Sequence, residues 1–450
     1  MRESPYKDLS QWGMPVYQHE TIQDAVNNGF ALDGIYQISL EDRCVLDVLV
    51  QNIGEISGSR SVLIGLNGAV TQRETKKGPF FSGTSITKEI GVPSISISDP
   101  TLDIDGKVGL AWYAGNETVP DLPARIAAII NGFAEKHEVR PILFGGSGAG
   151  FAALSISSYL NVFHTAVVWN PQTRIVKYFA RFVERYVKSA FPKLWSKMYT
   201  RSALPRNNPE PFLASLLDRS GISHSLDAKH ANQLGQVLFL QNRDDWHVGT
   251  HAEPFLQQFG IWRRKGPDSF MAANANFGAV FGDWGEGHAA PPRELIHKLL
   301  DFCVANTNIF PDGPSSIFSL FAKDSPYDWP LCTDKPSPNV RTISGEVTTV
   351  ERNRAGETLL QLDVVYSNST STVLAELSFH PSILDGVGST YAFYLLVDGK
   401  RVQARWYESK PYVAFEVGRD ISLDAKLEVV AFSKTTSGLV KRIRKLVSLN

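Results

Sequence analysis

Cysteine, net charge and long apolar runs are all scarce in this 450-residue chain. Its three cysteines, Cys44, Cys303 and Cys332, cannot form a complete set of disulfides, which favours free thiols buried in a reducing compartment. No stretch reaches the ~18 apolar residues that a membrane-spanning helix needs. Lys and Arg total 45 against 46 Asp and Glu, so no overall basic field exists to attract nucleic acid.

The first residues, MRESPYKDLSQWG, contain no apolar run of the kind that a secretory signal needs. We therefore expect a cytoplasmic protein. The composition, 43% hydrophobic and 20% charged, is typical of globular proteins and excludes disordered, collagen-like and coiled-coil chains. We expect no cofactor, and the composition leaves the oligomeric state open.

Short apolar strands alternate with helices through the first two thirds of the chain. We expect strand character at 38–50, strands at 61–65, 92–98, 140–144, 165–169, 236–241 and 277–281, and helices at 121–137, 151–160 and 292–305. Such alternation predicts an α/β fold with a mostly parallel sheet covered on both faces. The long segment at about 174–232 interrupts the series, and we expect it to form a helical cap.

The chain changes character near residue 306. Residues 306–340 are rich in Pro, Asp and Ser, which indicates a linker. Beyond it, 341–433 reads as about seven short strands without a helical stretch. Asp398-Gly399 between two of them is the signal of a two-residue hairpin. We therefore predict a domain over 1–305, a linker over 306–340 and a small antiparallel β-sandwich over 341–450.

A glycine-rich motif, FGGSGAGF over 144–151, lies between a predicted strand and a predicted helix. A serine on such a sharp turn is held in strained backbone geometry with its hydroxyl lifted out of the sheet. The residues two before and two after Ser147 must be small because strand and helix nearly touch, and they are Gly145 and Ala149. The motif predicts Ser147 as a nucleophile.

A phosphate-binding P-loop would need a lysine, and none is present in the motif, so this interpretation is excluded. Two other interpretations stay open, a dinucleotide-binding turn and a structural turn. Gly148, Gly150 and Ala153 have the looser spacing of a dinucleotide-binding turn, but no acid follows about 20 residues later. A purely structural glycine turn is the remaining alternative.

The chain resembles an α/β-hydrolase over about residues 35–305. Ser147 on the elbow is followed by an acid after a later strand and by a histidine after the last strand, in the chain order of that fold. The resemblance implies Asp245 in the turn NRDDWHV as the triad acid, with Asp244 as the alternative. It implies His288, on a glycine-rich loop, as the general base.

The resemblance also implies an oxyanion hole of two backbone donors. One is Gly148, directly after the nucleophile, and the other is Ala69 or Gly68, after the strand at 61–65. Relatives often carry histidine where this chain has Asn67. We expect the pocket to be lined by Asn67, Gly146 and His247.

A metal site must be weighed beside the predicted acid. His247 and His251 form an H-x-x-x-H pattern, which places both rings on one face of a helix. No glutamate follows the first histidine and no third ligand is evident, so we expect no metal.

These residues predict serine-dependent acyl transfer through an acyl-enzyme, as an esterase or an O-acyltransferase. The phrases VVWNPQT, LQNRDDWHV, YAFYLLVDGK and ARWYES are similar to α/β-hydrolase-like proteins of bacterial capsule and surface-glycan biosynthesis. That similarity implies a glycan or another acylated small molecule as substrate. The alternative is a non-catalytic scaffold or binding protein that keeps the fold.

Two further patterns have a structural and a functional interpretation. Basic residues recur at helical spacing in the expected cap, at Arg174, Lys177, Arg181, Arg185 and Lys188. They form either a solvated helix face or a surface for an anionic substrate or peripheral membrane contact. The aromatic residues of the expected sandwich, Tyr391, Tyr394, Trp406 and Tyr407, are either core residues or a platform for stacking sugars.

Overall fold

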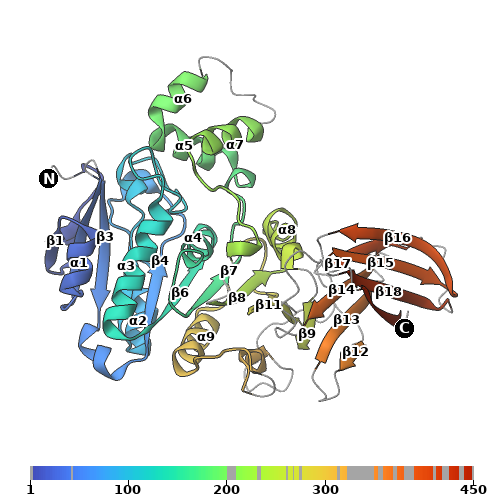
Figure 1. The fold of residues 1–450 in the computed structure, drawn as a ribbon. Helices are drawn as coiled ribbons and strands as arrows, with labels where there is room; N and C mark the ends of the chain where they lie inside the picture. Colours follow the sequence, from blue (N-terminus) through green and yellow to red (C-terminus); the bar gives the residue numbers. More distant parts are fainter. Residues whose placement is uncertain are drawn as a thin grey trace. The chain divides into compact units, whose positions relative to one another are not determined.

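The computed structural model describes most of the chain. The described residues are 4–41, 44–199, 209–230, 235–259, 262–266, 268–272, 276–311, 315–321, 349–352, 358–367, 372–379, 390–408, 412–417, 425–434 and 440–447. Two compact units are found (Figure 1). The first comprises 1–258, 266–269 and 275–336, and the second comprises 259–265, 270–274 and 337–450.

An eleven-stranded sheet, in the order β1-β2-β3-β5-β4-β6-β7-β8-β11-β10-β9, is the main feature of the fold. Its strands are β1 (Val16–His19), β2 (Gly34–Glu41), β3 (Cys44–Gln51), β4 (Ser61–Leu66), β5 (Ser94–Ile97), β6 (Arg140–Gly146), β7 (His164–Trp169), β8 (Gly235–Asn242), β9 (Trp262–Gly266), β10 (Ser269–Ala272) and β11 (Phe277–Gly282). Strand β3 is antiparallel to both neighbours, whereas β5, β4, β6, β7, β8 and β11 pair in parallel. This mixed, mostly parallel sheet is of the α/β-hydrolase type, so the expected fold class is confirmed.

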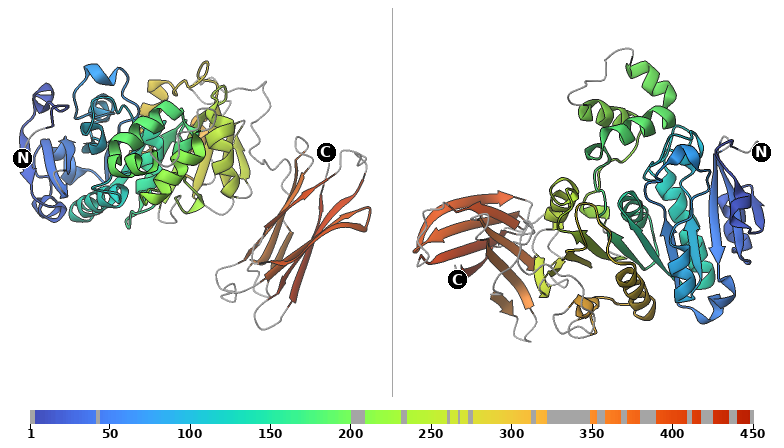
Figure 2. Two further views of the ribbon diagram at one scale, coloured as in Figure 1. Left: turned by 90° about the horizontal axis from the view of Figure 1, so that it is seen from above. Right: turned by 180° about the vertical axis from the view of Figure 1, so that it is seen from behind.

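Helices cover both faces of this sheet, as the view from above shows (Figure 2). They are α1 (Ile22–Asn28), α2 (Thr84–Ile90), α3 (Leu122–His137), α4 (Gly148–Ser157), α8 (Glu253–Leu256) and α9 (Arg293–Ala305). Helices α1, α3 and α4 pack in a row, and α2 packs against α9. Helix α3 buries Leu122, Ile126, Ile130 and Phe133, whose spacing of three to four residues places them on one helix face.

The expected strands and helices are present, with small shifts at their ends. The exception is the expected strand character at 38–50, which covers parts of two strands. Strands β2 and β3 pair antiparallel in this region, with Ser39 opposite Val45 and Ile38 opposite Leu46. The two apolar segments are separated in the sequence by the charged run Glu41-Asp42-Arg43, which is the signal of this break.

The cap expected at 174–232 contains three helices in the described residues. They are α5 (Ala180–Ala190), α6 (Pro192–Tyr199) and α7 (Glu210–Arg219), and they pack against one another (Figure 1). Their buried side chains include Val183, Tyr186, Leu213 and Leu216. The chain enters this cap from the end of β7 and returns to the sheet at the start of β8, which makes it an insertion between neighbouring parallel strands.

The second unit contains two four-stranded antiparallel sheets. One has the order β12-β13-β14-β17 and the other β16-β15-β18-β19. Their strands are β12 (Thr349–Arg352), β13 (Thr358–Ser367), β14 (Thr372–Phe379), β15 (Thr390–Val397), β16 (Lys400–Glu408), β17 (Tyr412–Glu416), β18 (Leu427–Lys434) and β19 (Val440–Val447). One apolar cluster draws side chains from both sheets, including Leu377, Phe393, Phe415 and Val429. This is the core of a β-sandwich.

The hairpin predicted at Asp398-Gly399 joins β15 to β16, with Val397 opposite Lys400. Both turn residues have positive φ angles, 49° at Asp398 and 78° at Gly399, as a two-residue turn of this kind requires. The sequence pattern does not predict strand β19, because four of its eight residues are Lys or Arg. The strand lies at the edge of its sheet, and Arg442 and Arg444 are exposed while Ile443 between them is buried.

Part of the expected linker is packed rather than extended. Residues Ile317–Phe321 form a 3-10 turn whose Ile317, Phe318 and Phe321 are buried in the described structure. Residues 322–340 of the linker lie outside the described residues, as does Cys332. Cys303 is buried and Cys44 is half-buried, and both are free thiols whose pKa burial raises, to about 12 and about 11. Among the described helices, none is long and apolar enough to cross a membrane.

Candidate active site

Ser147 occupies the turn between β6 and α4. Its backbone has φ 55° and ψ −119°, a conformation that is costly for any residue with a side chain. The N–H of Ser147 donates to the carbonyl oxygen of Trp169 at 2.9 Å, at the end of the neighbouring strand β7. The turn therefore holds Ser147 at the carboxyl end of the sheet, and the side chain is half-buried.

Small residues are required around this turn because larger side chains would collide with their neighbours. A Cβ atom added at Gly145 would lie 2.6 Å from the Cβ of Ala149, and one at Gly150 would lie 2.6 Å from the Cβ of Pro171. At Gly146 the added atom would meet the indole of Trp169. The strand and helix thus approach as closely as the sequence motif predicts, and alanine is tolerated at 149 because its partner is glycine.

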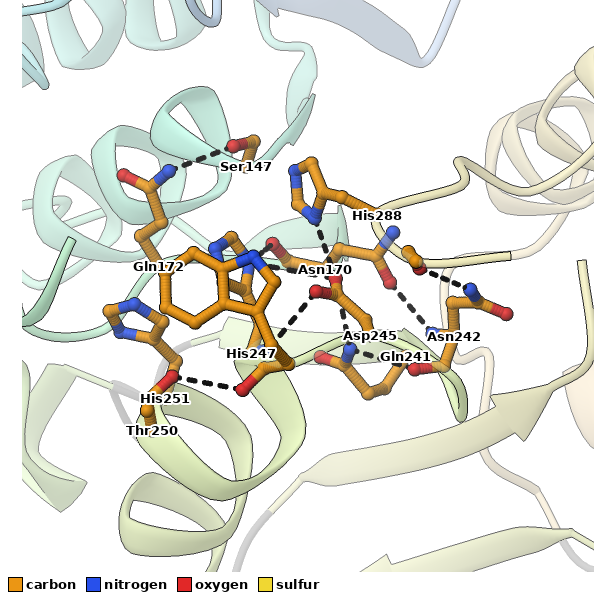
Figure 3. Close-up of polar contacts among 12 residues, drawn as sticks. Ser147, Asn170, Gln172, Gln241, Asn242, Asp245, His247, Thr250, His251 and His288 are labelled. Carbon is orange, nitrogen blue, oxygen red and sulfur yellow. Dashed lines mark hydrogen bonds and ion pairs between the residues drawn. The ribbon is translucent and has the colours of Figure 1, made fainter. Parts of the chain in front are cut away.

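Asp245 and His288 are brought together from two different loops (Figure 3). Nδ1–H of His288 donates to Oδ2 of Asp245 at 2.6 Å. The Asp245 side chain is fully buried, whereas that of His288 is 35% exposed. A short bond from an imidazole to a buried carboxylate fixes the ring tautomer and leaves Nε2 as the proton acceptor.

Asp244, the alternative acid, lies elsewhere. Its side chain is exposed, and its Oδ2 accepts a hydrogen bond from the N–H of Gly287 at 3.2 Å. Asp245, in contrast, also accepts from the backbone N–H of His247 at 3.0 Å. Of the two neighbouring carboxylates, Asp245 is therefore the one bonded to the imidazole.

Asn242 holds the loop that carries His288. Its Nδ2 donates to the carbonyl oxygens of Gly285 and Gly287, at 2.8 and 2.7 Å. Its Oδ1 accepts from the N–H of Trp284 at 2.9 Å. The fully buried side-chain amide of Asn242 thus satisfies three backbone groups in a loop that is not part of a β-strand. In the sequence Asn242 is only a polar residue at the end of a buried strand, which gives no sign of this role.

Asn170 connects the same loops from the end of β7. Its Oδ1 accepts from the N–H of Asn242 at 2.7 Å, and its Nδ2 donates to the carbonyl oxygen of Ala289 at 2.7 Å. It has a positive φ of 43°, which asparagine tolerates better than most residues. The signal in the sequence is the segment Asn-Pro-Gln-Thr, three of whose four residues are polar, directly after a buried strand.

The Ser147 hydroxyl is bonded to Gln172. Nε2 of Gln172 donates to Oγ of Ser147 at 2.9 Å (Figure 3). Within the described structure no hydrogen bond joins Ser147 to His288. Both side chains lie at the carboxyl edge of the sheet, because β6 and β11 end there, but the contact between them is not closed in this conformation.

The predicted oxyanion hole has its parts near the elbow. Gly148 is the first residue of α4, so its N–H has no acceptor within that helix. The loop after β4 approaches closely, since a Cβ atom added at Gly68 would lie 3.3 Å from the carbonyl oxygen of Gly146. Ala69, the other candidate donor, is exposed. Gly68 and Ala69 both stay candidates for the second donor.

Asn67 is buried in a network that fixes this loop. Its backbone N–H donates to the Tyr113 hydroxyl at 2.9 Å, and its Oδ1 accepts from that hydroxyl and from the N–H of Asp99. Its Nδ2 donates to the carbonyl oxygen of Gly68 at 3.1 Å. The side chain expected to line the pocket thus holds the backbone of the loop.

His247 and His251 lie next to the Asp245–His288 pair. Nδ1 of His247 donates to the carbonyl oxygen of Asn170 at 3.3 Å, and its ring packs against that of His288 with centroids 4.2 Å apart. Burial lowers the pKa of His247 to about 4, although the Asp245 carboxylate opposes the shift. Burial also lowers the pKa of His251 to about 2, with the nearby His247 adding to the effect. Both rings are therefore neutral at pH 7.

The three groups Asp245, His247 and His288 could also be ligands of a metal ion. Each offers a ligand atom, and these atoms all lie within 4.8 Å of one another. The 2.6 Å between Oδ2 of Asp245 and Nδ1 of His288 is a hydrogen-bond distance, whereas two ligands of one tetrahedral zinc ion lie about 3.3 Å apart. The arrangement fits a proton relay better than a metal coordination shell. His251, the second histidine of the H-x-x-x-H pattern, is not among the three.

Several basic residues of the cap region are bonded within the protein. Lys177 forms an ion pair with Glu210 at 2.6 Å, and Arg185 faces Glu74 at 3.7 Å. The guanidinium of Arg174 donates to the carbonyl oxygen of Thr250. These contacts engage part of the basic surface within the fold.

The aromatic residues of the sandwich divide into two groups. Tyr391 belongs to the apolar core, whereas the side chains of Trp406 and Tyr407 are 60% and 39% exposed. Tyr394 packs edge-on against Trp406, with ring centroids 5.4 Å apart. The guanidinium of Arg401 lies over both rings.

Comparison with known proteins gives structural matches only. No family model matches the chain, and no curated protein matches it. Among solved structures, an esterase of Pyrococcus furiosus matches with 13% identity and a TM-score of 0.31, over 58% of this chain and 85% of its own. An S-formylglutathione hydrolase from Agrobacterium tumefaciens matches with 12% identity and a TM-score of 0.32, over 61% and 93%. A poly(3-hydroxybutyrate) depolymerase from Bordetella parapertussis matches with 12% identity and a TM-score of 0.30, over 65% of this chain and 96% of its own.

Proposed function

We propose that the protein is a serine-dependent acyl-transfer enzyme that acts through an acyl-enzyme, with Ser147 as nucleophile, His288 as base and Asp245 as the residue that orients it. The observation that carries the proposal is the 2.6 Å bond between His288 and Asp245 at the same sheet edge as the strained Ser147. Strain at a nucleophile and a buried carboxylate behind a histidine are features that packing alone does not require.

The reaction would proceed in two steps, formation of the acyl-enzyme and its breakdown. Nε2 of His288 takes the proton of the Ser147 hydroxyl as Oγ bonds to the carbonyl carbon of the substrate, and then gives that proton to the departing oxygen. In the second step an attacking hydroxyl loses its proton to His288 as its oxygen bonds to the acyl carbon, and His288 returns that proton to Oγ as the bond between the acyl carbon and Oγ breaks. The N–H of Gly148 and a donor from the loop at Gly68 or Ala69 would stabilise the oxyanion in both steps.

The acceptor decides between two activities. Water as acceptor makes the protein an esterase, and a sugar hydroxyl makes it an O-acyltransferase. A glycan or another acylated small molecule is the proposed substrate, in line with the sequence similarity to surface-glycan proteins. A sugar that accelerates release of p-nitrophenol from p-nitrophenyl acetate, and is recovered acetylated, would support the transferase over the esterase.

A non-catalytic scaffold is the second candidate. The observation in its favour is that the Ser147 hydroxyl is bonded to Gln172 and not to His288. Catalytic hydrogen bonds are often incomplete without substrate, so this observation alone does not decide against an enzyme.

Labelling with a fluorophosphonate probe tests the proposal. The wild-type protein should be labelled covalently, and Ser147→Ala should not be. Ser158→Ala is the matched control, because Ser158 ends the same helix and its hydroxyl only donates to the carbonyl oxygen of Ser155. Equal labelling of the wild type and Ser147→Ala, or no labelling of folded wild type, would favour the scaffold.

A further inference from the structure

Gln172 presents its side-chain amide to the proposed nucleophile from a fully buried position. Its Nε2 donates to Oγ of Ser147 at 2.9 Å (Figure 3). Its Oε1 accepts a hydrogen bond from the indole N–H of Trp112. An indole can only donate, so Trp112 dictates which end of the amide faces it. The N–H end is therefore the one that faces Ser147.

The backbone around Gln172 is fixed as well. Its N–H donates to the carbonyl oxygen of Ser147 at 3.1 Å. On its other side, the hydroxyl of Thr173 donates to the carbonyl oxygen of His251 at 2.8 Å. Gln172 is thus anchored to the elbow by its backbone and its side chain. These contacts hold its amide N–H in a fixed position beside Oγ of Ser147. Such a preorganised donor stabilises a developing negative charge without reorganising.

We propose that Gln172 is a catalytic residue that stabilises Ser147 Oγ as the leaving group when the acyl-enzyme breaks down. This inference rests on the proposed function and deepens it, because it assigns a selective role in the second half-reaction. Only interactions that strengthen between ground state and transition state accelerate a step.

The two half-reactions use this hydrogen bond differently. Before acylation the Ser147 hydroxyl already accepts this hydrogen bond, so the bond stabilises the starting state of the attack as well as its transition state, and acylation gains little from it. In the acyl-enzyme Oγ starts as a weakly accepting ester oxygen. As the acyl carbon–Oγ bond breaks, Oγ takes the electron pair, and the Gln172 N–H bonds it more strongly until His288 returns the proton. The gain therefore belongs to deacylation.

A stopped-flow experiment with p-nitrophenyl acetate separates the two steps. The burst of p-nitrophenol reports acylation, and the steady-state release reports deacylation. In Gln172→Met, which keeps the length but removes the donor, deacylation should fall about 10- to 100-fold while the burst rate constant changes less than about threefold. Intact-mass measurement should show the acetylated enzyme accumulating during turnover.

Two further variants keep the result interpretable. Gln172→Glu has nearly the same shape and places an acceptor before Ser147, so it should accumulate acyl-enzyme even if the Met variant folds poorly. Gln236→Met is the matched control, because Gln236 is also buried and bonded at both ends of its amide but lies at the start of β8. Its kinetics should equal those of the wild type.

The outcomes distinguish this inference from the proposed function. If the folded variants lose acylation and deacylation equally, Gln172 only positions the elbow, and the inference is wrong. It is also wrong if neither rate changes. If wild type and Ser147→Ala release p-nitrophenol alike, the proposed function itself fails, and this inference fails with it.

Discussion

The carboxylate of Asp245 and the imidazole of His288 are 43 residues apart in sequence and are joined by a 2.6 Å hydrogen bond. Neither loop could establish this contact alone. Strands β8 and β11 pair in parallel with Asn242 opposite Gly282, so both loops begin at the same level of the sheet. The relay is thus a consequence of strand register.

Asp245 and Asp244 provide a direct test of this relay. In Asp245→Asn the buried amide no longer stabilises the protonated imidazole, and p-nitrophenyl acetate hydrolysis should fall by about 10³- to 10⁴-fold in kcat. Asp244→Asn, which affects an exposed contact to Gly287, should stay within about fivefold of the wild type. A larger loss at Asp244 than at Asp245 would contradict the assignment.

Asn242 should be needed to hold the His288 loop. Asn242→Asp places carboxylate oxygens against the carbonyl oxygens of Gly285 and Gly287, and should lower the free energy of unfolding by about 1–3 kcal/mol and reduce kcat. Asn306→Asp is the control, because Asn306 also donates to a carbonyl oxygen, that of Phe302. Urea denaturation and hydrolysis assays measure both effects, and equal losses in the two variants would argue against a special role for Asn242.

The close approach of strand and helix at the elbow predicts a stability cost. In Gly145→Ala the new Cβ would lie 2.6 Å from the Cβ of Ala149. The free energy of unfolding should therefore fall by about 1–3 kcal/mol. Gly58→Ala has open space around the added atom and should be nearly neutral. Thermal and urea denaturation test the pair. A neutral Gly145→Ala would mean that the elbow relaxes more easily than its packing indicates.

The buried histidines predict a loss of stability in mild acid. The pKa of His251 is about 2 in the folded protein and near 6.5 when unfolded, so the unfolded chain binds the proton first as the pH falls. Between pH 7.5 and 5.0 this group alone should remove about 2 kcal/mol from the free energy of unfolding. The burial-lowered pKa of His247 acts in the same direction.

Replacing His251 tests this assignment. In His251→Asn the new amide keeps an acceptor near the Thr173 N–H but cannot titrate, so the variant should lose about 2 kcal/mol less than the wild type between pH 7.5 and 5.0. His297→Asn, at a half-exposed position in α9, should keep the wild-type difference. Urea denaturation at the two pH values provides the comparison. An unchanged difference in His251→Asn would show that other groups cause the acid sensitivity.

Local rules account for the features that residue order predicts correctly. The spacing of Gly145 and Ala149 around Ser147 follows from the steric demands of a tight strand-to-helix turn. Asp398-Gly399 supplies the positive φ angles of a hairpin within two residues. In helix α3, the apolar spacing alone identifies the buried face. In each case the interacting residues are close in sequence, so composition and order carry the information.

Other features depend on contacts between distant segments. Asp244 and Asp245 are chemically identical neighbours, and only the direction in which the turn after β8 faces buries one and exposes the other. Gln172 and Asn242 are ordinary polar residues in the sequence, and their roles arise from the groups that β6, β7 and β11 bring beside them. Residue types and the order of the strands were sufficient to predict a serine, an acid and a histidine in that chain order. The hydrogen bonds among them required the folded sheet, because a hydrogen bond depends on direction and distance that sequence spacing does not encode.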